Sequence, residues 1–200
     1  MKKIRNILCY SYNDFNNIME TNGWFTDKDL PKNVAIISIG APWNEGEGHW
    51  FKNSSSNVLN IDFDDASPTQ WWNGQDLYDK AQEDTDQSKY FSYTYTTKFG
   101  KTYLHAFDYN QAQKLVVFIE THNDCDFYIH CSAGISRSQG VVRYILDTYS
   151  DEFDINTNPD NPCLCPNTHV VLMLKRAFKN LYYDNYNIDN SHDLDEISKQ

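Results

Sequence analysis

The chain has 200 residues, a formal net charge of −11 at pH 7, and a hydrophobic fraction of 40%. This length suits one domain with a substantial core, and no apolar run approaches the length of a membrane span, so no membrane association is expected. A strongly acidic chain is a poor match for nucleic acid or for anionic lipid surfaces, so we expect neither as a partner.

The amino terminus and the cysteines both favour a reduced compartment. Residues 1–10 are basic at the start but contain no sustained apolar stretch and no small-residue cleavage site, so no signal peptide is predicted. The five cysteines are an odd number, and an intracellular, cytoplasmic location is the simplest interpretation. Cys163 and Cys165 lie close together, but no second Cys or His pair completes a tetrahedral set, so no metal or other cofactor is expected.

The first elements expected along the chain are a short helix and two strands. Ser11 and Asp14 form a candidate cap pair for a helix over 11–19. The run 34–39 is apolar except at Ser38, which is typical of a buried parallel strand. Residues 58–63 predict a second strand that runs into a group of aspartates.

The later elements alternate between helix and strand. Their apolar spacing predicts a helix over 108–122, a strand over 126–130, a helix over 139–146 and a last helix over about 168–181. Asp108 and Gln111 form a candidate capping box, and Asn167 or Thr168 is the candidate cap of the last helix. This alternation predicts a single α/β domain whose central sheet is mostly parallel and is flanked by helices.

The segment 68–104 interrupts the alternation. Residues 90–97 are rich in β-forming side chains, and 99–101 can turn the chain back into 102–104, so we expect a hairpin here. Residues 184–200 are polar and acidic and are expected to form a flexible tail.

The stretch 130–138 reads His-Cys-Ser-Ala-Gly-Ile-Ser-Arg-Ser and places Cys131 six positions before Arg137. Backbone N–H groups of such a short loop can form an anion nest, and the helix that follows adds its N-terminal N–H groups and positive dipole end. The same field favours the thiolate of Cys131, and the forked guanidinium of Arg137 matches two phosphate oxygens. The alternative, a buried structural cysteine, gives Arg137 no role.

This loop resembles the active-site loop of the cysteine-dependent protein tyrosine phosphatases, in their small dual-specificity branch. The resemblance implies that Cys131 is a nucleophile that passes through a cysteinyl-phosphate intermediate, that Arg137 binds the phosphoryl oxygens and that Ser138 assists the leaving thiolate. His130 matches the histidine that orders the loop and tunes the thiol. The remaining phosphate-binding positions implied by the resemblance are Ser132, Ala133, Gly134, Ile135 and Ser136.

The leaving oxygen needs a proton, and therefore a carboxylic acid on a separate loop. The segment 58–65 resembles the family segment in which a strand ends in the general-acid aspartate; the match places Asp65 there, with Asp64 as the alternative. Asp65 precedes Cys131 by 66 residues, a longer interval than in small members of the family. An insertion at about 68–104, within a phosphatase domain over 1–183, would explain the difference. Without such an insertion, the acid would be Asp84, Asp86 or Asp108.

The sequence thus predicts a tyrosine/dual-specificity phosphatase-like fold and a phosphoric monoester hydrolase. The expected substrate is a phosphorylated protein or peptide, with phosphotyrosine as the first candidate and phosphoserine or phosphothreonine as further ones. Two alternatives are a non-catalytic phosphate-binding pseudophosphatase and a phosphatase of a non-protein phosphate ester. Inert relatives tend to lose the cysteine or the arginine, and both are present here. Lipid and inositol-phosphate relatives often carry lysines inside the loop, and 132–136 contains none.

Overall fold

A computed structural model describes residues 3–42, 48–67, 91–98, 100–151, 153–158, 161 and 165–183 of the chain. Within these residues, the centre of the molecule is a parallel five-stranded sheet of order β3-β2-β6-β1-β7. Its strands are β1 (Lys3–Tyr10), β2 (Val34–Gly40), β3 (Val58–Asp62), β6 (Asp126–His130) and β7 (Phe153–Thr157). The predicted strands over 34–39, 58–63 and 126–130 are thus confirmed.

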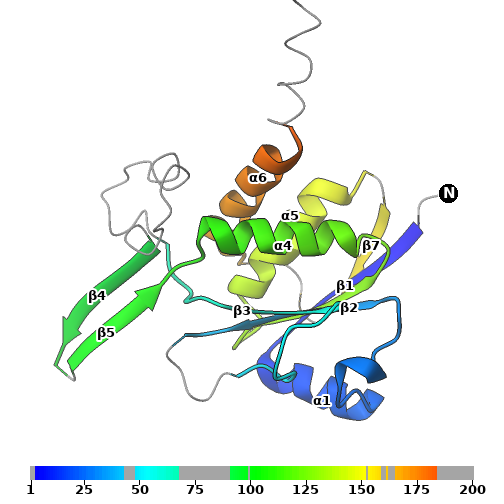
Figure 1. Ribbon diagram of the computed structural model, residues 1–200, viewed down its shortest axis with the longest axis horizontal. Coiled ribbons are helices and arrows are strands. Elements are labelled where there is room, and N and C mark those ends of the chain that lie inside the picture. Colours follow the sequence, from blue (N-terminus) through cyan, green and yellow to red (C-terminus); the bar gives the residue numbers. More distant parts are fainter. Residues whose placement is uncertain are drawn as a thin grey trace, which may run out of the picture.

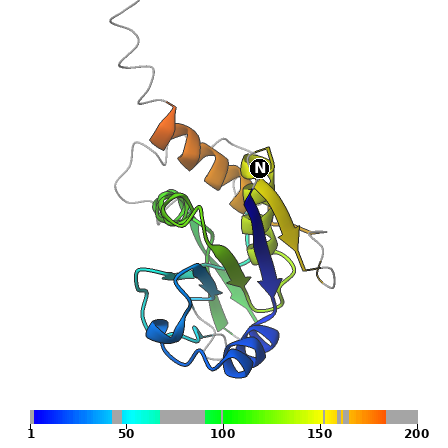
Figure 2. The same ribbon diagram turned by 90° about the vertical axis from the view of Figure 1, so that its right-hand side faces the viewer.

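Helices cover both faces of this sheet (Figures 1 and 2). They are α1 (Tyr12–Asn22), α4 (Tyr109–Thr121), α5 (Arg137–Tyr149) and α6 (Thr168–Tyr182), and a short 3₁₀ turn, η1, spans Asp27–Asp29. Phe15 and Met19 of α1 pack with Val34 and Ile36 on one face, while α4, α5 and α6 enclose the larger core on the other. The predicted α/β architecture with a mostly parallel sheet is therefore confirmed.

The helix starts follow local capping chemistry. Ser11 caps α1 by accepting a hydrogen bond from the Asp14 N–H, and Asp108 and Gln111 form a reciprocal capping box on α4. Of the two candidate caps for α6, the structure uses Asn167, whose side chain accepts from two backbone N–H groups of the first turn. These short-range patterns could be read from sequence because each involves residues no more than three positions apart.

Two strands of the sheet were not predicted. The strand β1 lies in the middle, between β6 and β7, but Lys3, Arg5 and Asn6 obscure its apolar alternation. Arg5 is nevertheless only 6% exposed. The strand β7 lies in a region that was expected to be a loop; it is short and polar, and in this sheet it pairs with β1 alone.

The predicted hairpin is confirmed as β4 (Ser92–Thr97) paired antiparallel with β5 (Gly100–His105). Figure 1 shows it projecting away from the main sheet. It is attached where its second strand ends, because Asp64 N–H donates to the His105 carbonyl and His105 N–H donates to Asp64 Oδ2, both at 2.7 Å. Residues 68–90 of the proposed insertion and the proposed tail over 184–200 lie outside the described residues.

Candidate functional site

The loop that contains Cys131 lies at the carboxyl edge of the parallel sheet. It begins where β6 ends at His130 and leads into α5 at Arg137. Because β6 pairs with β1 on one side and β2 on the other, the ends of both strands flank the loop. Crevices at the carboxyl ends of strands are where open α/β sheets bind ligands. This edge also gathers most of the predicted site residues.

The loop's alternate carbonyl groups are bonded to donors beyond the loop. Ser132 O accepts from Tyr12 N at 3.0 Å, Gly134 O accepts from Asn161 Nδ2 at 3.0 Å, and Ser136 O accepts from Gly140 N at 2.8 Å. An anion nest needs this arrangement, because a carbonyl oxygen turned toward a bound anion would repel it. The described contacts are therefore compatible with a phosphate seat inside the loop.

Gly134 brings the loop against the end of β1. Its φ of 69° is in the left-handed region, which favours glycine. A Cβ atom at this position would lie 2.6 Å from the Ser11 nitrogen and the Tyr10 carbonyl carbon. Only glycine permits so close an approach, so the turn of the loop rests directly on the chain between β1 and α1.

The thiol of Cys131 lies deep in the loop, where the residue is 2% exposed. Its Sγ is 3.1 Å from Ser138 Oγ. A second thiol, Cys9 Sγ, donates to the same Ser138 oxygen at 3.1 Å. With its oxygen occupied as an acceptor by Cys9, the Ser138 hydroxyl can donate its own hydrogen to the Cys131 sulfur, which would stabilise a thiolate. The structure thus brings Ser138 to Cys131, and it adds Cys9, which was not predicted.

Arg137 is 6% exposed, and its guanidinium is hydrogen-bonded to main-chain carbonyls. Its Nη1 donates to Gly40 O and to Phe63 O, each at 3.0 Å. Gly40 ends β2 and Phe63 follows β3, so these two bonds fix the plane of the guanidinium relative to two strand ends. A planar fork fixed in this way is suited to binding two oxygens of one anion.

His130 stands behind the loop as a neutral imidazole. It is 1% exposed, and its ring centroid lies 4.2 Å from that of Phe15. Burial, followed by the neighbouring His49 and Arg137, lowers the pKa of His130 to about 3. Its Nε2 lies 2.6 Å from Ser38 Oγ. Since it carries no charge near neutral pH, His130 acts on the loop through packing and through its contact with Ser38.

Asp65 reaches the loop from the segment after β3. Its Oδ1 accepts from Ser136 Oγ at 2.8 Å and from Asn167 Nδ2 at 2.7 Å. The carboxylate is exposed and bridges the loop to Asn167, the N-cap of α6. The structure therefore joins Asp65 to the Cys131 loop across 71 positions of sequence.

The competing aspartates have other contacts. Asp64 is engaged with the backbone of His105 at the hairpin, and Asp108 caps α4 while lying 3.2 Å from His105 Nε2. Asp84 and Asp86 lie outside the described residues. Among the described candidates, Asp65 is the carboxylate that accepts a hydrogen bond from the loop.

Two asparagines that were not predicted support the loop from the side. The Asn158 side chain bonds both main-chain groups of Cys9, with Oδ1 accepting at 2.9 Å and Nδ2 donating at 2.7 Å. Asn161 Nδ2 donates to Cys9 O and to Gly134 O, both at 3.0 Å. A hollow of about 500 Å³ opens beside them and is bordered by Ala133 of the loop. An Asn-rich segment was the only sequence signal for these contacts.

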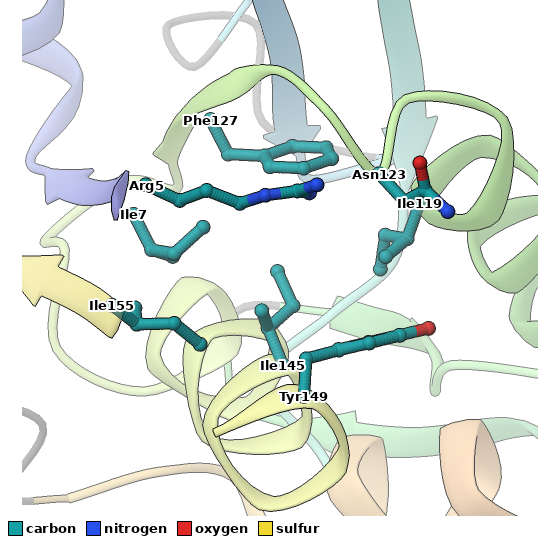
Figure 3. Close-up of a pocket in the computed structure, with 8 residues that line it drawn as sticks. All are labelled: Arg5, Ile7, Ile119, Asn123, Phe127, Ile145, Tyr149 and Ile155. Carbon is teal, nitrogen blue, oxygen red and sulfur yellow. The ribbon is translucent and has the colours of Figure 1, made fainter. Parts of the chain in front are cut away.

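Another cavity lies toward the amino ends of the strands. Figure 3 shows the Arg5 side chain running alongside the Phe127 ring toward Asn123, with Ile145 and Tyr149 across the gap. Its accessible volume is about 10 Å³, room for about one water molecule. It is therefore a packing defect rather than a substrate site.

No family model, curated protein or solved structure matches the chain. Within the part of the chain that the structure describes, no three His, Cys, Asp or Glu side chains form a group that could hold a metal ion. In the same part, no helix is long and apolar enough to cross a membrane. Function is accordingly argued from the Cys131 loop and its contacts.

Proposed function

We propose that the chain is a cysteine-dependent phosphatase of phosphate monoesters, with a phosphorylated protein or peptide as its substrate and a tyrosine/dual-specificity phosphatase-like fold. The observation that carries the proposal is the meeting of three groups at one loop. Cys131 lies within it, Arg137 closes it from the first turn of α5, and Asp65 bonds to Ser136 on it from a distant segment. A nucleophile, an anion clamp and an acid are the parts that this chemistry needs.

In the first step the Cys131 thiolate attacks phosphorus, and the bond to the ester oxygen breaks as the S–P bond forms. Arg137 and the loop N–H groups bind the equatorial oxygens, where charge accumulates. Asp65, as the carboxylic acid, gives its proton to the leaving oxygen. Its hydrogen bond to Ser136 supports this role, because it keeps the carboxyl group at the rim of the loop.

In the second step a water molecule attacks the phosphorus of the cysteinyl-phosphate. Asp65, now a carboxylate, accepts the proton of that water, and the S–P bond breaks to release inorganic phosphate. Ser138 Oγ, 3.1 Å from the sulfur, donates to Cys131 as negative charge returns to it. The cycle ends with the thiolate and the protonated acid restored.

The local charge supports anion binding in a chain that is acidic overall. The net charge of −11 disfavours anions at long range, whereas Arg137 and the N-terminus of α5 make the loop locally positive. A small positive binding site in an acidic molecule favours substrates in which the groups around the phosphate are neutral or basic. This supports a peptide substrate over a polyanion such as RNA or a phosphoinositide.

The test is turnover of matched phosphotyrosine, phosphoserine, phosphoinositide and RNA 5′-triphosphate substrates, followed by acid quenching to trap phosphate on the protein. We expect release of phosphate from phosphotyrosine peptides and a phosphorylated peptide that contains Cys131. Cys125→Ser is the matched control, because Cys125 is a buried free thiol that immediately precedes β6. Phosphate binding without turnover on every substrate would favour the pseudophosphatase alternative. Preference for a non-peptide ester would favour the second alternative, a phosphatase of a non-protein phosphate ester.

A further inference from the structure

Four polar side chains form a continuous line from His130 to the surface, here called the relay. His130 Nε2 lies 2.6 Å from Ser38 Oγ, Ser38 Oγ lies 2.7 Å from His49 Nδ1, and His49 Nε2 lies 3.0 Å from Asp62 Oδ1. Ser38 is 1% exposed, whereas the Asp62 side chain is 53% exposed. The relay therefore connects the residue before Cys131 to solvent through a buried hydroxyl.

The register of the sheet creates the relay. Ser38 of β2 pairs with His130 of β6, and two residues further along β2, Gly40 pairs with Asp62 of β3. The strands β3, β2 and β6 are adjacent in the sheet, with β2 in the middle. Ser38 interrupts the otherwise apolar run 34–39. An apolar side chain at this position would contribute only to packing. A buried serine that contacts two imidazoles indicates a hydrogen-bonding role.

Gly40 provides the space for the outer half of the relay. A Cβ atom at position 40 would lie 2.2 Å from Asp62 Oδ1 and 3.2 Å from His49 Cε1. The first distance is far inside van der Waals contact, so a side chain here would push the carboxylate away. The close approach of His49 and Asp62 thus depends on a glycine at the end of β2.

The two ends of the relay restrict where its hydrogens lie. At the outer end, the Asp62 carboxylate only accepts, so it favours a hydrogen on His49 Nε2. At the inner end, His130 Nδ1 is buried and has no hydrogen-bond partner among the described residues, so a hydrogen on this nitrogen would be left unpaired. A hydrogen on His130 Nε2 is paired, because Nε2 can donate it to Ser38 Oγ at 2.6 Å.

Both ends are satisfied together in one hydrogen order. His130 Nε2 donates to Ser38, Ser38 donates to His49 Nδ1, and the hydrogen on His49 Nε2 faces the Asp62 carboxylate. Without that carboxylate, the hydrogen of His49 can lie on Nδ1. This permits the reverse order, in which Ser38 donates to His130 Nε2 and the hydrogen of His130 lies on Nδ1.

We propose that Asp62, His49 and Ser38 are positioning residues that hold His130 in one tautomer and thereby keep the Cys131 loop in its reactive form. The inference rests on the proposed function for the role of Cys131. It adds three residues that touch neither the sulfur nor a substrate. Metal-bound histidines are oriented in the same way by their outer hydrogen-bond partners.

The experiment compares Asp62→Asn and Ser38→Ala with the wild-type protein. Asparagine keeps the shape of Asp62 but donates as well as accepts, so it removes the bias on hydrogen order. The tautomer of each histidine is read from ¹⁵N chemical shifts in long-range ¹H–¹⁵N spectra. Separately, the rate of iodoacetamide alkylation is measured on the peptide that contains Cys131. Neither readout needs a phosphate ester, so a failed phosphatase assay does not prejudge the result.

We expect a single His130 tautomer in the wild type and a mixed or reversed population in both variants. Alkylation of Cys131 should slow by about two- to tenfold, the equivalent of one net hydrogen bond. Asp14→Asn is the matched control, since it removes the same exposed charge near the loop but has no contact with the relay. Unchanged His130 spectra and alkylation in Asp62→Asn and Ser38→Ala would overturn the proposal. Equal effects from Asp14→Asn would show that Cys131 responds to any nearby negative charge and not to the relay, and would also overturn the proposal.

Discussion

The Cys131 loop and the segment that carries Asp65 are held in place by different means. The loop is contiguous in sequence and is bonded through its own main chain to α1, α5 and Asn161. The Asp65 segment reaches the site through side chains, with Ser136 and Asn167 as partners. The loop is buried at its base, whereas Asp65 is exposed.

This difference separates two demands of the proposed reaction. The nucleophile and the clamp must be pre-organised, because their contribution depends on fixed geometry around the phosphoryl group. The acid must exchange its proton and also admit substrate, and an exposed carboxylate on a connecting segment can do both. Substitutions in the loop should therefore affect every substrate, and substitutions around Asp65 should depend on the leaving group.

The largest effect is expected from Cys131→Ser. Removing the nucleophile should lower turnover of an aryl phosphate by several orders of magnitude, while phosphate binding and the fold remain close to wild type. Steady-state kinetics and a thermal melt in the presence of phosphate measure both properties. A variant that retains more than about a hundredth of wild-type activity would contradict the role of Cys131.

Arg137→Lys should have the next largest effect. Lysine keeps the charge, but a single ammonium cannot both bond Gly40 O and Phe63 O and bind two phosphoryl oxygens. We expect KM to rise and kcat to fall by about a hundredfold, whatever the leaving group. Wild-type values of both constants would place the anion clamp elsewhere.

Asp65→Asn should distinguish the two regions. Phosphotyrosine, a poor leaving group, should react about a hundredfold more slowly, whereas esters of activated phenols should be affected much less. The alkaline limb of the pH–rate profile should also flatten, because that limb reports the essential acid. Asp64→Asn is the control and should matter less, since its carboxylate bonds the hairpin. Equal losses for all leaving groups would show that Asp65 only positions the loop.

The smallest effect is expected from Asn167→Ser. Serine retains the helix cap of α6 but removes the Nδ2 donor that holds Asp65 at 2.7 Å. Turnover of phosphotyrosine should fall by about two- to tenfold, the equivalent of one hydrogen bond, with little change in melting temperature. Asn167→Ala removes both the helix cap and the donor to Asp65. If only this variant has a lower melting temperature, the cap stabilises the fold and the Asp65 contact serves turnover.

What could be predicted from sequence was local. The strand, loop and helix around Cys131 are contiguous, and the caps at Ser11 and Asp108 act over three positions. Such patterns can be recognised from the order of the residues alone. The same holds for the largely apolar run that becomes β2, whose composition alone indicates burial on both faces.

What escaped prediction depends on contacts between distant segments. Arg5 and Asn6 gave β1 the composition of a surface segment, although Arg5 is buried beside Phe127. The relay was missed because Ser38 and His49 acquire their partners only through the register of the sheet. Cys9 was missed for the same reason, since 129 positions separate it from Ser138.

The place of β1 in the sheet has a consequence for how the molecule folds. Ile7 pairs with Phe127, and Lys3 pairs with Phe153, so β1 can join the sheet only after segments 120 and 150 positions later in the chain have been synthesised. Topologies dominated by such remote pairings fold slowly, and meanwhile the apolar Ile7 and Cys9 are open to misassociation or to chaperones. Since Gly134 rests on the end of β1, the Cys131 loop gains this support only once β1 has joined the sheet.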